Sequence, residues 1–164
     1  MILSGINPTA RTPASDTYWG DWPTAPSNMC SILLVEDHLD TRQAFAAILR
    51  SWGHTVATRG SVAGGLHFLD ENKVDIVLSD IGLPDRNGYE FIAEARQRTP
   101  NLTAIAVSAY FTAADQKLGH HAGFDMFFSK PVDLAALEVV LERMSEHRSN
   151  GHDAGQCDAA ADRD

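Results

Sequence analysis

The chain has 164 residues, which is enough for one domain with a sizeable core. Hydrophobic residues make up 44% of it and charged residues 21%, the proportions of an ordinary globular domain. A net charge of −9 argues against a nucleic-acid-binding surface, and no stretch approaches the roughly 18 consecutive apolar residues of a membrane-spanning helix.

The first residues and the cysteines bear on the cellular compartment. No basic region followed by an apolar core stands at the start, so no secretory signal is expected. Cys30 and Cys157 are too few for a disulfide framework and are expected to be free thiols in a reducing compartment. These observations predict a cytoplasmic protein that binds neither nucleic acid nor a membrane.

The two ends of the chain differ in composition from its middle. Residues 1–28 contain four of the seven prolines among many small polar residues, which predicts a disordered leader. Tyr18, Trp19 and Trp22 are out of character there and could dock on the domain or on a partner; composition decides neither. Residues 149–164 contain four aspartates and one arginine and are predicted to form a disordered acidic tail. One folded domain is therefore expected at 29–148.

Between these ends, short apolar runs typical of buried strands alternate five times with helical patterns. The expected strands cover residues 32–35, 54–58, 74–79, 102–107 and 124–128. Two helices are expected at 88–98 and 112–123, and the inner faces of the other three are formed by Phe45, Ile48, Leu49 and Trp52, by Val62, Leu66 and Leu69, and by Leu134, Leu137, Leu141 and Met144. The alternation predicts an α/β fold in which helices cover both faces of a parallel sheet.

Helix ends carry signals of their own. Gly53 suits the left-handed position that follows a helix. Ser61 and Asp133 suit N-cap positions, and Thr112 with Asp115 has the spacing of a capping box. These residues predict where four of the helices begin or end.

Polar side chains stand where four of the predicted strands end. Glu36 and Asp37 follow the first strand, Asp80 the third, Ser108 the fourth and Lys130 the fifth. Each has a plain alternative as an N-cap acid, a turn serine or a solvated lysine. Because the carboxyl ends of parallel strands share one edge of the sheet, where such folds place their ligand sites, we expect these side chains to converge.

The converging groups suggest a particular chemistry. Three carboxylates in one pocket repel one another unless a cation is present, and an all-oxygen cluster of this kind suits Mg²⁺. A carboxylate beside Mg²⁺ can attack a phosphoryl group and form an aspartyl-phosphate. Lys130 can supply positive charge and Ser108 a hydroxyl to the phosphoryl oxygens.

These motifs resemble the receiver domain of two-component response regulators. The matching pieces are Leu-Leu-Val-Glu36-Asp37, Asp80-Ile-Gly-Leu-Pro84 with Gly88 after it, Ser108-Ala109 and Lys130-Pro131, in the family's order over about residues 31–144. The resemblance implies a flavodoxin-like, doubly wound (βα)5 parallel sheet of strand order 2-1-3-4-5.

The resemblance also implies roles for the chemical residues. It assigns Asp80 as the phosphoacceptor, and Glu36, Asp37, Asp80 and the Gly82 carbonyl as the Mg²⁺ site. Lys130 falls at the family's phosphate-contacting lysine. The implied activity is that of a signalling phosphoacceptor and not of an enzyme, because the domain catalyses only its own phosphorylation and slow dephosphorylation.

Further residues match positions that control switching and hydrolysis in this family. Ser108 and Ala109 fall at the hydroxyl switch position and its neighbour, and Phe127 falls at the switch aromatic. Gly82 and Tyr110 flank the path of the hydrolytic water. The implied partners are a histidine kinase or phosphotransfer protein and an unknown output protein, which would bind through the surface formed by residues 109–137.

Two other functions fit parts of the pattern. A haloacid-dehalogenase-like phosphatase also uses an aspartyl-phosphate, but its general acid two residues beyond the nucleophile is missing here, where Gly82 follows Asp80 and Leu39 follows Asp37. A flavin-binding electron carrier would hold the phosphate of its cofactor after the first strand, where the acidic pair Glu36 and Asp37 would repel it. We therefore expect a receiver, either a single-domain regulator or part of a hybrid histidine kinase.

Overall fold

A computed structural model of the chain describes residues 29–109 and 112–151. Within these residues five strands alternate with five helices. The strands are β1 (Ser31–Val35), β2 (Thr55–Arg59), β3 (Ile76–Asp80), β4 (Thr103–Ser108) and β5 (Met126–Ser129). The helices are α1 (Leu39–Ser51), α2 (Val62–Glu71), α3 (Gly88–Arg98), α4 (Ala113–Ala122) and α5 (Leu134–Gly151).

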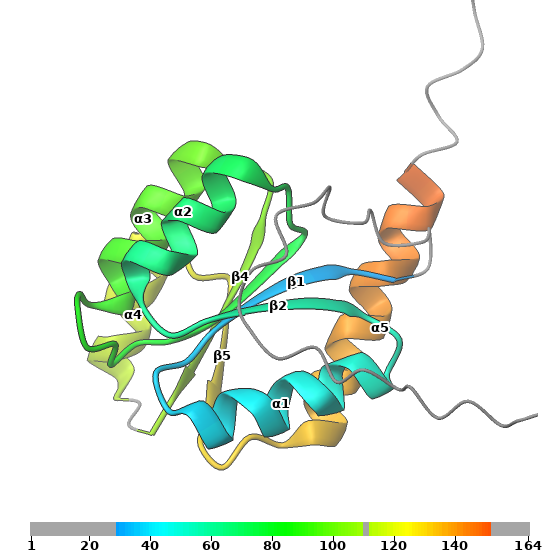
Figure 1. Ribbon diagram of the computed structural model, residues 1–164, viewed down its shortest axis with the longest axis horizontal. Helices are drawn as coiled ribbons and strands as arrows, with labels where there is room; N and C mark the ends of the chain where they lie inside the picture. Colours follow the sequence, from blue (N-terminus) through cyan, green and yellow to red (C-terminus); the bar gives the residue numbers. More distant parts are fainter. Residues whose placement is uncertain (1–28, 110–111, 152–164) are drawn as a thin grey trace, which may run out of the picture.

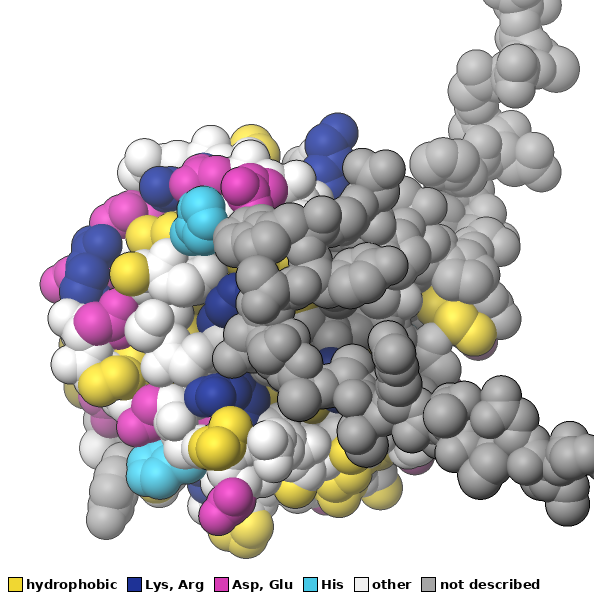
Figure 2. Space-filling view, in the orientation of Figure 1, with side chains coloured by type: hydrophobic (Ala, Val, Ile, Leu, Met, Phe, Trp, Pro, Cys, Tyr) yellow, Lys and Arg dark blue, Asp and Glu magenta, His cyan; other side chains and the backbone are white. Residues whose placement is uncertain are grey.

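The strands form one parallel sheet in the order β2-β1-β3-β4-β5. Helices α2, α3 and α4 cover one face of this sheet, and α1 and α5 cover the other (Figure 1). The predicted flavodoxin-like fold and its strand order are therefore confirmed. On the face shown in Figure 2, acidic and basic side chains of the described residues are intermingled.

The core has two halves, one on each face of the sheet. Along β1, Leu33 and Val35 pack with α2 and α3, whereas Ile32 and Leu34 pack with α1 and α5. All four side chains are at most 2% exposed. A strand that is covered on both faces needs apolar side chains in both directions, which explains the continuous apolar runs in the sequence.

The helix ends follow the predicted signals. The Ser61 side chain accepts a hydrogen bond from the Gly64 N–H at 3.2 Å, and Thr112 with Asp115 forms both halves of a capping box. Asp133 Oδ1 accepts from the Ala136 N–H at 3.0 Å at the start of α5. Gly53 ends α1 with a φ of 93°, a conformation that favours glycine.

Several strand boundaries and the burial of one residue differ from the sequence-based expectation. Strand β3 begins at Ile76 and includes Asp80, which pairs with Val107, so the acid is part of the sheet edge. Phe124 lies in the core just before β5 and is 2% exposed. Leu134 was expected on the buried face of α5 but is 39% exposed, because the whole first turn of that helix lies at the surface.

The ends of the chain fall largely outside the described residues. The predicted leader, 1–28, lies outside them, and α5 continues to Gly151, where the predicted acidic tail has begun. Within the described ranges, no helix has the length and apolar character needed to cross a membrane.

Candidate functional site

The carboxyl ends of β1, β3 and β5 bring three charged side chains together. Lys130 follows β5, and its Nζ lies 2.6 Å from Asp80 Oδ2 at the end of β3 and 2.8 Å from Glu36 Oε2 after β1. Glu36 is 3% exposed. One ammonium group thus bridges two carboxylates that are 44 residues apart in the chain, as the convergence of the strand ends predicted.

The bridge sets the charge state of the lysine. Burial by itself lowers the pKa of Lys130, but the hydrogen bonds and charges of Asp80 and Glu36 outweigh burial and raise its pKa above the ordinary value. The ammonium group is therefore charged at neutral pH, directly beside the Asp80 carboxylate.

Both acids of the pair after β1 contact a histidine, His38, that the sequence analysis did not single out. His38 Nδ1 lies 2.8 Å from Asp37 Oδ1 and 3.3 Å from Glu36 Oε1, and the His38 backbone N–H donates to the same Glu36 oxygen at 3.2 Å. Hydrogen bonding with Glu36 and the charge of Asp37 raise the pKa of this exposed imidazole.

The donor atoms fit a hard dication such as Mg²⁺. Ligand atoms of Glu36, Asp37 and His38 lie within 4.8 Å of one another, and Lys130 links Glu36 to the Asp80 carboxylate. The Lys130 ammonium group contacts two of the three carboxylates, Glu36 and Asp80, whereas Asp37 contacts His38. Carboxylate oxygens are the ligands that Mg²⁺ prefers, so the residues present suit this ion.

The loop after β3 holds Asp80 from its other side. Asp80 Oδ1 accepts a hydrogen bond from the Gly82 N–H at 3.0 Å, and the Gly88 N–H donates to the Ile81 carbonyl at 2.8 Å. A Cβ atom on Gly88 would lie 2.6 Å from the Asp80 carbonyl oxygen. Glycine at this position therefore lets the start of α3 close tightly over the end of β3.

The end of β4 lies beside the bridge. Ser108 pairs with Ser129 across the sheet, and its carbonyl accepts from the Lys130 N–H at 2.8 Å. Ala109 follows and is exposed, whereas Tyr110 lies outside the described residues. Ser108 is thus at the predicted edge of the sheet and is tied to the segment that carries Lys130.

Phe127 lies on β5 and faces α4. Its ring makes an edge-on contact with His120 at 4.8 Å between centroids and a tilted contact with Phe124 at 5.9 Å. A Cβ atom on Gly119 would lie only 2.4 Å from the ring, so the ring rests directly on the α4 backbone at this glycine. The aromatic residue three positions before Lys130 therefore couples β5 to α4.

Comparison with known proteins decides the family. The family model of the response regulator receiver domain matches residues 32–142. The chain belongs to this family. It is 36% identical over 124 residues to the sensor histidine kinase RcsC of Salmonella typhi, a match that covers 75% of this chain and 13% of that kinase.

Two further similarities concern other receiver-sized proteins. The chain is 31% identical over 111 residues to an uncharacterized 14.6 kDa protein of Leptolyngbya boryana, covering 66% of this chain and 83% of that one. It is also similar to the crystal structure of the receiver domain of sensor histidine kinase PA1611 from Pseudomonas aeruginosa PAO1, in which a magnesium ion is coordinated in the active site cleft. That match has 28% identity and a TM-score of 0.65, and covers 71% of this chain and 98% of that one.

Two residues of this receiver support the site without having been foreseen. Arg42 of α1 donates from Nη1 to the Glu36 carbonyl at 2.6 Å and to the Asp37 carbonyl at 3.2 Å. Asp85, in the loop after β3, accepts from the Val62 and Ala63 N–H groups at 2.9 Å and so caps α2. Spacing in the sequence gives no signal for such contacts, because both join a side chain to backbone atoms of another segment.

Proposed function

We propose that Asp80 of this receiver accepts a phosphoryl group from a partner histidine kinase or phosphotransfer protein, in a reaction that requires Mg²⁺. The observation that carries the proposal is the Lys130 ammonium group, which bridges Asp80 and Glu36 at the carboxyl edge of the sheet. It offers positive charge at the point where phosphoryl oxygens would come to lie.

In the proposed reaction, an Asp80 oxygen forms a bond to phosphorus while the bond from phosphorus to the donor's imidazole nitrogen breaks. The electron pair remains on that nitrogen, which takes up a proton. The Gly82 N–H holds the second Asp80 oxygen at 3.0 Å and so orients the carboxylate. Glu36, Asp37, Asp80 and the Gly82 carbonyl would hold Mg²⁺, whose charge stabilises the phosphoryl oxygens.

Phosphorylation is proposed to shift an existing conformational equilibrium that controls partner binding. A phosphoryl group on Asp80 gives the Ser108 hydroxyl a new acceptor, and Ala109 follows at the exposed end of β4. Phe127, packed on Gly119 of α4, is the side chain that would repack in response. The output partner would therefore bind the surface formed by residues 109–137.

Hydrolysis of the acyl phosphate is proposed to depend on the residues that flank the attacking water. Gly82 has no side chain to orient water, whereas the ring of Tyr110, a residue outside the described ranges, would shield the phosphoryl group. We expect slow dephosphorylation and no activity on other substrates.

The setting of the module is part of the proposal. The folding unit is taken as 29–148, acting in the cytoplasm. The match to the RcsC kinase covers 13% of that protein, as expected if the chain is the receiver of a hybrid kinase. The match to the 14.6 kDa protein covers 83% of it, as expected if the chain is a single-domain regulator.

The experiment is phosphorylation by a small phosphodonor such as acetyl phosphate, read by intact mass. We expect the wild-type chain to gain one phosphoryl group with Mg²⁺ and none after chelation. Asp80→Asn should gain none, because the amide is not an anionic nucleophile. Asp40→Asn, which changes an exposed aspartate of α1, should behave as wild type. Equal labelling of wild type and Asp80→Asn would refute the proposal.

A further inference from the structure

The side chain of His38 lies beside the acidic pair, although it takes no part in the proposed phosphorylation chemistry. His38 is the N-cap residue of α1, yet its side chain makes no capping hydrogen bond, and 75% of that side chain is exposed. The imidazole therefore neither caps the helix nor packs in the core. Its Nδ1 instead lies 2.8 Å from Asp37 Oδ1 and 3.3 Å from Glu36 Oε1.

Glu36 offers a different oxygen to each of its two neighbours. Its Oε2 accepts from the Lys130 ammonium group at 2.8 Å, whereas its Oε1 faces His38. The bridge to Lys130 thus occupies one side of this carboxylate. On the other side, Glu36 Oε1, Asp37 Oδ1 and His38 Nδ1 gather as a separate cluster of donor atoms.

The spacing of these atoms suits a single metal ion. Two ligand atoms that are each bonded at roughly 2.1 Å to one ion lie about 3.0 Å apart in octahedral geometry and about 3.4 Å apart in tetrahedral geometry. The two distances from His38 Nδ1, 2.8 and 3.3 Å, fall close to this range. Ligand atoms of all three residues lie within 4.8 Å of one another, so small rotations of the exposed side chains bring them onto one ion.

The backbone that carries the cluster is held in place. Arg42 Nη1 donates to the Glu36 carbonyl at 2.6 Å and to the Asp37 carbonyl at 3.2 Å. The His38 N–H donates to Glu36 Oε1 at 3.2 Å. Three consecutive residues in a turn fixed in this way form a preorganised set of ligands.

The donor set indicates which kind of ion it would hold. Mg²⁺ prefers oxygen ligands, whereas imidazole nitrogen suits Zn²⁺ and neighbouring transition metals. Two carboxylates balance the charge of a dication. Three protein ligands with a further position open to water are an arrangement that Zn²⁺ adopts in proteins.

We propose that Glu36 Oε1, Asp37 Oδ1 and His38 Nδ1 form a binding site for Zn²⁺ or a transition-metal dication of the same ligand preference. The ion takes the place of the hydrogen that Nδ1 shares with the two carboxylates. The inference stands independently of the phosphorylation of Asp80, because the site uses neither Asp80 nor the oxygen of Glu36 that Lys130 holds.

The test is an NMR titration of the full chain with Zn²⁺, which is diamagnetic. The chain has seven histidines, so the readout must be local: the Asp37 backbone amide reports binding at this turn, and the His38 Nδ1 signal reports nitrogen ligation. In the wild type, both signals should move over the same range of Zn²⁺ concentration. In His38→Gln, the Asp37 signal should need at least about tenfold more Zn²⁺, because loss of even a supporting partner typically costs about 10–100-fold in metal affinity.

Two controls separate ligation from indirect effects. A Mg²⁺ titration followed at the same Asp37 amide should give affinities that agree within about twofold in the wild type and in His38→Gln, since Mg²⁺ prefers oxygen ligands. His121→Gln replaces an exposed histidine of α4 and should leave the Zn²⁺ titration of Asp37 unchanged.

Three results would overturn the inference. One is an equal Zn²⁺ dependence of the Asp37 signal in the wild type and in His38→Gln. Another is a His38 Nδ1 signal that stays in place while the Asp37 signal moves. The third is a loss of Mg²⁺ affinity in His38→Gln as large as the loss of Zn²⁺ affinity, which would show that His38 only positions the acidic pair.

Discussion

At the scale of single residues, the bridge formed by Lys130 is the feature on which the site depends. Its ammonium group stabilises Glu36, a carboxylate that is 3% exposed, as well as Asp80. A buried carboxylate without a counter-charge is costly, because the charged form loses its hydration. Lys130 therefore has a structural effect that is separable from any contact with phosphate.

Replacement of Lys130 by methionine keeps the stem and removes the charge. We expect Lys130→Met to lower the free energy of unfolding by about 1–3 kcal/mol in magnesium-free buffer. Denaturant unfolding measures this. The matched control is Arg86→Met, which removes an exposed cation bonded to Glu90 and Glu94 and should cost less than about 1 kcal/mol. Equal stability of wild type and Lys130→Met would contradict the bridging role.

Arg42 acts on the acidic pair through its backbone. Its guanidinium group holds the carbonyls of Glu36 and Asp37, and loss of such supporting contacts typically lowers metal affinity about 10–100-fold. We expect Arg42→Met to weaken Mg²⁺ binding in calorimetric titration. Arg50→Met removes a similar hydrogen bond from α1 to the Val56 carbonyl at 2.7 Å and should leave Mg²⁺ affinity unchanged. Equal losses of Mg²⁺ affinity in both variants would mean that Arg42 acts only through the general stability of the fold.

At the scale of elements, the loop that follows β3 is fastened to α2 by Asp85. Burial raises the pKa of this carboxyl, but the hydrogen bonds from the Ala63 and Val62 N–H groups outweigh burial and lower its pKa. A folded-state pKa below the unfolded value of about 3.9 means that the carboxylate stabilises the fold above that pH. The contribution is lost as the pH falls through the folded-state pKa.

The prediction for Asp85→Asn follows from this lowering of the Asp85 pKa in the folded state. We expect the variant to be less stable than wild type by about 0.5–1 kcal/mol at pH 7, the scale of a helix-capping charge. The difference should shrink as the pH falls below about 4. Thermal unfolding at a series of pH values measures it. A difference that is the same at pH 7 and at pH 3 would show that the charge of Asp85 contributes nothing.

The sequence predicted elements better than it predicted contacts between them. The strand ends that carry Glu36, Asp80 and Lys130 were identifiable because apolar runs stop at charged residues. The Ser61 and Thr112 caps were identifiable because capping is local. The exposure of Leu134 could not be identified from the sequence, because periodicity places a residue on one face of a helix but does not say where the neighbouring layer ends.

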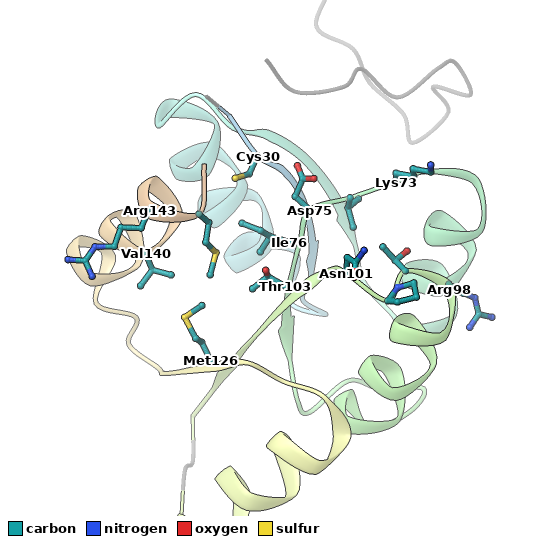
Figure 3. A pocket seen from close by; sticks show the side chains of 14 residues that line it. Cys30, Lys73, Asp75, Ile76, Arg98, Asn101, Thr103, Met126, Val140 and Arg143 are labelled. Carbon is teal, nitrogen blue, oxygen red and sulfur yellow. The ribbon is translucent and has the colours of Figure 1, made fainter. Parts of the chain in front are cut away.

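Contacts between distant segments left no local signal. The bridge joins residues 94 positions apart, and the sequence indicated only that Lys130 and Glu36 share an edge of the sheet. Nothing in the spacing of Arg42 indicated that it donates to two carbonyls of a preceding turn. A groove at the opposite edge of the sheet, lined by Met126 of β5 and Val140 of α5 (Figure 3), depends on how α5 packs against the strand starts, which no sequence motif encodes.

At the scale of the whole molecule, the Lys130 bridge and a groove lined by Ile76, Thr103 and Met126 lie at opposite edges of the sheet. Strand β3 joins them, with Ile76 at the groove and Asp80 at the bridge, about 13 Å apart along the strand. A ligand at one edge therefore does not cover the other. The match to the sensor histidine kinase RcsC of Salmonella typhi covers only 13% of that kinase, so the chain corresponds to a small part of it.

The identity of the phosphorylated side chain is the central claim, and chemical trapping tests it most directly. Borohydride reduces an acyl phosphate and turns the modified aspartate into homoserine, which peptide mass spectrometry locates. After treatment of the full chain with a phosphodonor and Mg²⁺, we expect homoserine at Asp80 and at no other acidic residue. Reduction at Asp37 or Glu36, or a phosphorylated chain with Asp80 unaltered, would contradict the account.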